Sequence, residues 1–126
     1  MSMFKGNALT WFEIPVNDVK RAVGFYETVL DAKLIPYPGD EPYYIFPADQ
    51  GAVAGALVQR PQSKPASQGT MVFLNADGKL DASVKRAQEL GVKVLVPRTQ
   101  VPGSTSFYAC IQDSEGNHVG LHSSQF

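Results

Sequence analysis

The feature that most constrains the fold is a repeated order of predicted elements: one strand, one helix and then three strands, found twice in 126 residues. In the first half these elements are expected at residues 8–16, 18–30, 32–37, 42–48 and 51–59, and in the second half at residues 70–76, 79–90, 92–97, 104–112 and 118–123. A repeat of this kind indicates two copies of one structural unit. A polar, proline-containing stretch separates them and is expected to be a linker.

Periodicity supports the two helices. In residues 18–30 the apolar side chains recur at the three- and four-residue spacing of an amphipathic helix, and Asn17 or Asp18 can cap its N-terminus. Residues 79–90 repeat this pattern, and Gly91 follows as a stop signal. Each helix would cover one face of a sheet, because an apolar stripe has to be buried against another element.

Matching residues support the repeat. Phe12 and Phe73 lie in the opening strands, 61 residues apart, and Gly55 and Gly120 lie in the closing strands. We therefore expect an α+β fold in which two tandem βαβββ modules form one cupped mixed sheet, with the helices outside and a shared cleft inside. The chain is expected to be a single domain, 1–126, with module one at about 8–60, a linker at 61–68 and module two at about 69–124.

Composition excludes several classes of function. The formal net charge is −1, so the chain has no basic surface for nucleic acid. Its apolar stretches are far shorter than a membrane span, and the N-terminal sequence lacks the pattern of a signal peptide. The single cysteine, Cys110, cannot form an internal disulfide. These features favour a cytoplasmic protein with neither nucleic acid nor membrane as a partner.

Two segments carry a family pattern: FEIPVNDVKRAVGFYETVLDAKL at 12–34 and DSEGNHVGLHS at 113–123. They resemble the vicinal oxygen chelate superfamily of glyoxalases, bleomycin resistance proteins and extradiol dioxygenases. Members show a V-x-D step before a helix with F-Y, and D-x-x-G-N before the last strand. The likeness covers essentially the whole chain, is closest to small glyoxalase-like proteins, and implies a homodimer. Asp31 replaces a usual glycine after the helix, and aspartate tolerates a left-handed backbone.

The resemblance also implies where a divalent metal would be held. Metal-dependent members place His, Glu or Gln in the first and last strands of each module, and the corresponding positions here are Trp11, Gly55, Thr70 and Gly120. Tryptophan and glycine side chains cannot ligate a metal ion, and threonine alone is a poor ligand. No metal cofactor is therefore predicted. These four positions and His118 are expected to contact an organic ligand, with the glycines widening the cleft.

The two histidines lie four residues apart, which would place them on one face of a helix. The alternation of Val119 and Leu121 with other residues predicts a strand instead. In that strand the side chains of His118 and His122 both point toward the cleft. A strand advances by about 7 Å for every two residues, so these two side chains, four residues apart, lie far from each other along it. They are therefore too widely spaced to share an ion easily.

Glu13 places a carboxylate on the cleft side of the first strand. Beside His122 it would form a catalytic acid–base pair that moves a proton at neutral pH; otherwise it forms a structural ion pair with Arg or Lys, or is exposed. Trp11 forms an aromatic wall for a flat or apolar ligand, or packs in the core. Other aromatic side chains are also candidates for the lining, although half of them must face the helices: Tyr43, Tyr44, Phe46, Phe107 and Tyr108.

Three functions are compared. The first is a glyoxalase-like protein that binds a small, partly apolar organic molecule in a cleft without metal ligands. The second is a metal-independent lyase or isomerase that uses Glu13 and His122. The third is a divalent-metal-dependent enzyme, similar to lactoylglutathione lyase or to the dioxygenases, with displaced ligands. The first is preferred, and whether the protein is an enzyme stays open.

Overall fold

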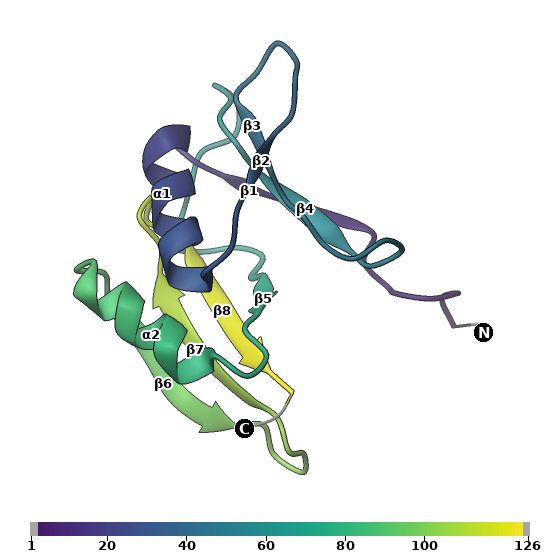
Figure 1. Ribbon diagram of the computed structural model, residues 1–126, viewed down its shortest axis with the longest axis vertical. Helices are drawn as coiled ribbons and strands as arrows, with labels where there is room; N and C mark the ends of the chain where they lie inside the picture. The colour runs from purple at the N-terminus through teal and green to yellow at the C-terminus, as the bar shows by residue number, and fades with distance from the viewer. Residues whose placement is uncertain (1–2, 125–126) are drawn as a thin grey trace.

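The computed structural model describes residues 3–124 and contains two helices and eight strands (Figure 1). They follow the predicted order in each half of the chain. The bounds are β1 Trp11–Pro15, α1 Val19–Leu30, β2 Ile35–Pro36, β3 Tyr43–Phe46, β4 Ala54–Val58, β5 Phe73–Asn75, α2 Leu80–Glu89, β6 Val94–Gln100, β7 Phe107–Gln112 and β8 His118–Ser123. The main difference is that β2 and β5 have only two and three residues.

Each module contributes one four-stranded mixed sheet. The strand orders are β1-β4-β3-β2 and β5-β8-β7-β6. In both sheets the opening strand runs parallel to the closing strand, and the other neighbours are antiparallel. The α+β class with tandem βαβββ modules is therefore confirmed, but the strands form two separate four-stranded sheets, one in each module, and not one continuous sheet.

Both helices end where the chain provides capping groups. The Asp18 carboxylate accepts a hydrogen bond from the backbone N–H of Arg21 at 3.1 Å and caps α1. The helix ends at Asp31, whose backbone is left-handed with a φ of 51°, and Gly91 follows α2 with a φ of 86°. Within residues 3–124, neither helix combines the length and apolar character needed to cross a membrane.

The two helices lie side by side (Figure 1). Helix α1 packs against the sheet of the first module and α2 against the sheet of the second, and both helices lie on the same side of the molecule. We call this the covered face. One core beneath them joins the modules and contains fully buried side chains from each: Tyr26, Val29, Leu57, Leu80, Ile111 and Leu121. On the opposite side, the open face, large apolar side chains remain exposed, namely Trp11, Ile35, Tyr37, Met71 and Phe73.

Buried residues determine how the two modules superpose. Ile14 and Leu74 are the buried residues of the opening strands, and they pair with the buried Leu57 and Leu121 of the closing strands. Equivalent positions in β1 and β5 are therefore 60 residues apart. The expected separation of 61 is wrong by one residue.

A shift of one residue turns the side chains of a strand to the opposite face. Phe12 lies on the covered face, with its ring 5.6 Å from that of Phe46. Phe73 lies on the open face and is 50% exposed. Since Gly55 pairs with Phe12 and Gly120 pairs with Phe73, the two glycines also lie on opposite faces.

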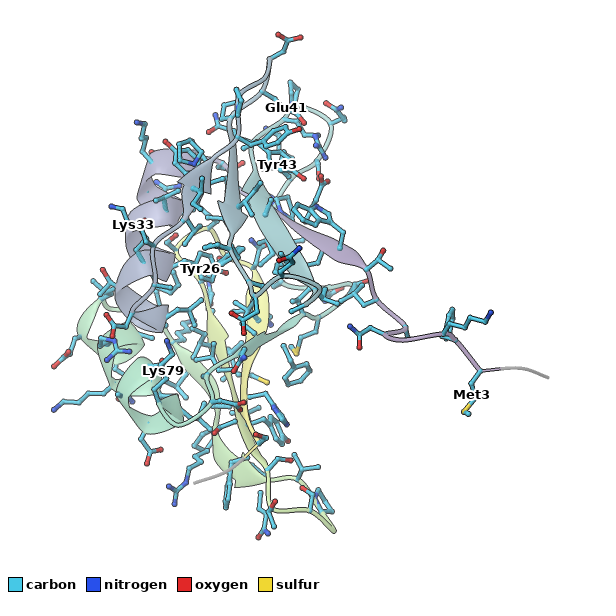
Figure 2. The ribbon with its side chains drawn as sticks, turned by 45° about the vertical axis from the view of Figure 1, so that its right-hand side comes forward. Met3, Tyr26, Lys33, Glu41, Tyr43 and Lys79 are labelled. Carbon is cyan, nitrogen blue, oxygen red and sulfur yellow. The ribbon has the colours of Figure 1, made fainter. Side chains whose placement is uncertain are left out.

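The second module holds both ends of α1. The first turn of this helix contains no acidic side chain, and its last turn contains no basic one. At the N-terminal end, the Glu115 carboxylate accepts the backbone N–H groups of the two residues that precede α1. At the C-terminal end, Lys79 and Arg86 donate to carbonyl oxygens of the last turn; Figure 2 shows Lys79 at this junction. The charges that a helix dipole favours thus come from the other module.

Candidate functional site

The larger cavity lies on the open face of the first module. It has a volume of about 670 Å³ and is lined by Trp11 of β1, Tyr43 of β3 and the β2–β3 turn at 37–41. We call it the Trp11 cavity. Figure 2 shows Glu41 and Tyr43 next to each other at the end of the molecule away from Lys79. Trp11 is 40% exposed, and the cavity has aromatic walls because the hairpin brings two tyrosines beside it.

A chain of hydrogen bonds joins the polar groups beside this cavity. The Trp11 Nε1–H donates to the Tyr43 hydroxyl at 3.0 Å, and that hydroxyl donates to Glu13 at 2.8 Å. Arg60 donates to the other oxygen of Glu13 at 2.8 Å. Its Nε and Nη2 groups donate to both carboxylate oxygens of Glu41, at 3.1 and 2.6 Å. The network therefore fixes the Trp11 ring through its edge and leaves the ring face available.

These contacts fix the protonation states. Hydrogen bonds from Arg60 lower the pKa of Glu13 and the pKa of Glu41, and they outweigh the burial that would raise both. Burial and the hydrogen bond to Glu13 raise the pKa of the Tyr43 hydroxyl. At neutral pH both carboxyl groups are ionised, and Tyr43 is a neutral donor.

A second, smaller cavity of about 240 Å³ lies where the two modules meet. It brings together three of the predicted site residues, Glu13, Thr70 and His118, and the turn residue Asn117 also lines it. Lys64 and other residues of the connecting segment form part of the wall. The expected shared cleft is thus divided: the larger space belongs to the first module alone, and only the smaller one lies between the modules.

His122 lies on the open face of the second sheet, where it pairs with Tyr108 and Asn75. The Glu13 carboxylate bonds to Tyr43 and Arg60, both in the first module. Among the described residues, no hydrogen bond or ion pair connects Glu13 with His122. The structure instead shows the ion pair with an arginine that was the alternative interpretation of Glu13.

The two glycines do not open the cleft. A methyl group at Gly55 would overlap the ring of Phe12 on the covered face, and one at Gly120 would overlap the ring of Phe73 on the open face. Each missing side chain is therefore replaced by a neighbouring ring. The expectation that Gly55 and Gly120 widen a ligand cavity is wrong, because a phenylalanine on the adjacent strand fills each space.

The residues at the metal positions do not fit a divalent ion. With Leu57 matched to Leu121, Ala56, and not Gly55, is the equivalent of Gly120. With Ile14 matched to Leu74, Met71, and not Thr70, is the equivalent of Trp11. The four positions then hold tryptophan, alanine, methionine and glycine, which together offer no carboxylate, imidazole or hydroxyl ligand. Within residues 3–124, no three His, Cys, Asp or Glu side chains gather closely enough to hold a metal ion.

Sequence reasoning identified Trp11 and listed Tyr43 among the lining candidates. Tyr44, Phe46 and Phe107 instead pack against the core. It missed Tyr37, Asp40, Glu41 and Arg60. The available signal was the acidic turn PGDEP between two predicted strands, but a turn's side chains can be assigned to a cavity only when the register of its hairpin is known.

The family follows from the whole chain. Residues 8–121 match the family model described as Glyoxalase/Bleomycin resistance protein/Dioxygenase superfamily. This chain belongs to that superfamily, as the resemblance implied. No curated protein matches the sequence.

Solved structures of the same fold agree. A glyoxalase/bleomycin resistance protein from Streptomyces sp. CB03234 is 28% identical, with a TM-score of 0.63 over 89% of this chain and 96% of that chain. TnmS3, an antibiotic binding protein from the same Streptomyces, is 24% identical, with a TM-score of 0.63 over 97% of this chain and 100% of that chain. FosX, a fosfomycin resistance protein from Listeria monocytogenes, is 16% identical, with a TM-score of 0.67 over 98% of this chain and 97% of that chain. At such identities, the last two show the fold alone.

Proposed function

We propose that this protein binds a small, partly apolar organic molecule in the Trp11 cavity without a metal ion. The observation that carries the proposal is the cavity: about 670 Å³ with aromatic walls, a size and lining typical of small-molecule sites. Trp11, Tyr37 and Tyr43 supply apolar ring surface, and the adjacent carboxylates supply a few fixed polar groups. This combination suits a ligand with an apolar body and a polar end.

The comparisons support binding of small organic molecules. TnmS3 is described as an antibiotic binding protein, and the 28% identical neighbour as a glyoxalase/bleomycin resistance protein. We extend only the general property, capture of an organic molecule, to this chain. The two enzymatic alternatives have less support. Arg60 and Tyr43 occupy the Glu13 carboxylate, and the metal positions lack ligands.

Trp11 is the single tryptophan of the chain, so its fluorescence reports directly on the cavity. Titration with N-phenyl-1-naphthylamine, a neutral aromatic dye, is expected to quench Trp11 emission with saturation at one dye per chain. Tyr37→Ala should weaken dye binding about tenfold, because the lost ring contact corresponds to roughly 1.4 kcal/mol.

Phe4→Ala is the matched control. Phe4 is 76% exposed and lies outside the cavity lining, so its loss should leave the dye affinity unchanged. Equal weakening by Phe4→Ala and Tyr37→Ala would point to nonspecific adsorption. Dye binding without any change in Trp11 emission would contradict binding in this cavity.

We also propose that the protein is a homodimer, as the resemblance implies. The open face leaves Met71 and Phe73 exposed at 39% and 50%, and exposed apolar groups of this kind favour association. Sedimentation equilibrium is expected to give twice the 13.7 kDa mass of one chain. Phe73→Glu should reduce the mass toward that of one chain. A single-chain mass for the wild type at all concentrations would contradict the proposal.

A further inference from the structure

Two of the three aromatic side chains of the Trp11 cavity, Trp11 and Tyr43, use their polar atoms in hydrogen bonds to neighbouring groups. The indole N–H of Trp11 donates to Tyr43, and the Tyr43 hydroxyl donates to Glu13. These rings therefore offer a ligand mainly their faces, which carry the negative part of the ring quadrupole. Trp11 and Tyr37 are 40% and 58% exposed, so the faces are accessible.

The spacing of two rings suits a cation. The centroids of Tyr37 and Tyr43 are 5.9 Å apart, with their planes tilted by 58°. A positive group placed in the angle between them can lie within about 6 Å of both centroids, the range of cation–π attraction. The Trp11 ring, the best type for this interaction, lies in the same lining.

The charges around the cavity have the matching sign. Asp40 and Glu41 line it, and Glu13 lies behind Tyr43. Arg60 is the one cation of this network, and it is engaged by Glu13 and Glu41 together. The net charge is −2 when the three carboxylates of Asp40, Glu41 and Glu13 are counted together with Arg60. No basic side chain belongs to the described lining of the cavity. Within residues 3–124, the Asp40 side chain has no hydrogen bond or ion pair.

We propose that the Trp11 cavity selects organic cations, in which a quaternary or tertiary ammonium group is attached to an apolar body. This inference rests on the proposed function of the same cavity and adds the class of ligand. A compact metal ion does not fit, since it requires several converging oxygen ligands and Arg60 occupies two of the three carboxylates. A diffuse ammonium group requires only ring faces and nearby negative charge.

The test uses two probes of the same shape. 4-(Trimethylammonio)benzyl alcohol and 4-tert-butylbenzyl alcohol differ in one central atom, a charged nitrogen in the first and a carbon in the second. Each competes with N-phenyl-1-naphthylamine while Trp11 emission is followed. The cation is expected to displace the dye at about tenfold lower concentration than the neutral probe.

Variants assign this preference to the rings and to the charge. Tyr37→Leu should reduce the preference to about twofold, whereas Tyr37→Phe, which keeps the ring face, should retain it. Asp40→Asn should also reduce the preference, and its effect should fall with added salt because the carboxylate is exposed. Glu89→Gln removes a carboxylate outside the cavity lining and should change nothing.

The outcomes separate this inference from the function on which it rests. If both probes displace the dye equally, the cavity binds organic molecules and its selectivity for cations is overturned. If neither the dye nor the probes alter Trp11 emission, both proposals fail. A preference for the cation that survives Tyr37→Leu and Asp40→Asn together would also overturn the assignment to these groups.

Discussion

Replacing Glu115 with glutamine is expected to lower the free energy of unfolding by about 3 kcal/mol at pH 7. The Glu115 side chain is fully buried and accepts hydrogen bonds at both carboxylate oxygens. Two donors are backbone N–H groups at the start of α1, and two are Arg21 nitrogens at 2.7 and 2.9 Å. Glutamine keeps the size of the side chain but removes the charge and points an N–H group at existing donors.

The effect should depend on pH. Burial alone would raise the pKa of Glu115, but hydrogen bonds from Arg21, Asp18, Ser114 and Asn17 outweigh burial and lower the pKa to about 2. An unfolded glutamate has a pKa of about 4.3. Because the folded pKa is the lower one, the stabilisation is complete above about pH 5 and is lost as the pH falls toward 2.

Urea unfolding followed by circular dichroism at pH 7 and at pH 2.5 measures this difference. The difference in unfolding free energy between the wild type and Glu115→Gln should narrow from about 3 to below about 1.5 kcal/mol, because at pH 2.5 the glutamate is protonated in the unfolded chain and folding has to release that proton. The exposed Glu89→Gln serves as the control and should stay within about 0.5 kcal/mol of the wild type at both values. An equal gap at both pH values would show that the charge of Glu115 contributes nothing.

Glu115 also shows which parts of the fold the sequence could reveal. The sequence predicts a turn at DSEGN before the last strand and, from its apolar spacing, a helix at 18–30, and the structure confirms both elements. Nothing in the sequence connected the two, because the contact joins residues 94 positions apart. Local patterns predict helices and strands, whereas the hydrogen bonds between Glu115 and the start of α1 depend on how the two modules pack together.

The register was the least predictable part of the fold. The stretch Val72-Phe73-Leu74 is apolar at three successive positions, so a period of two does not show which residue faces the core. Residue type alone pairs Phe73 with Phe12, whereas the burial of Ile14 and Leu74 determines the register in the structure. The same error places Gly55 on the open face together with Gly120, whereas Gly55 lies on the covered face and Gly120 lies on the open face as expected.

The candidate site was predictable where a strand alone determines a side chain's direction. Alternation placed Trp11 and Glu13 on the open face, and the structure has both there, beside the open-face Tyr43. Arg60 follows a strand and Glu41 lies in a turn, so their ion pair depends on the pairing of β3 with β4. That pairing is a tertiary property, so local sequence patterns do not show that Glu41 and Arg60 lie beside the Trp11 cavity.

Replacing Gly55 with alanine is expected to cost about 3 kcal/mol of unfolding free energy, the upper end of the usual cost of overpacking. The new methyl group would overlap the Phe12 ring, including its Cγ atom, which a rotation of the ring leaves in place. Phe12 cannot retreat easily, because its ring lies 5.6 Å from that of Phe46, which itself packs at 5.4 Å from Tyr26. The strand must shift or the aromatic cluster must repack.

Gly24→Ala provides the opposite sign with the same chemical change. Gly24 lies within α1, and a methyl group there would have no heavy atom within 4 Å. Alanine is the better helix former, so this variant should gain about 1 kcal/mol.

Phe12→Leu introduced together with Gly55→Ala should recover part of the loss, since the smaller side chain leaves room for the methyl group. Urea unfolding of the wild type, Phe12→Leu, Gly55→Ala and the double variant measures the coupling free energy between the two substitutions. Strictly additive losses for Phe12→Leu and Gly55→Ala would show that the Phe12 ring does not fill the place of the missing side chain.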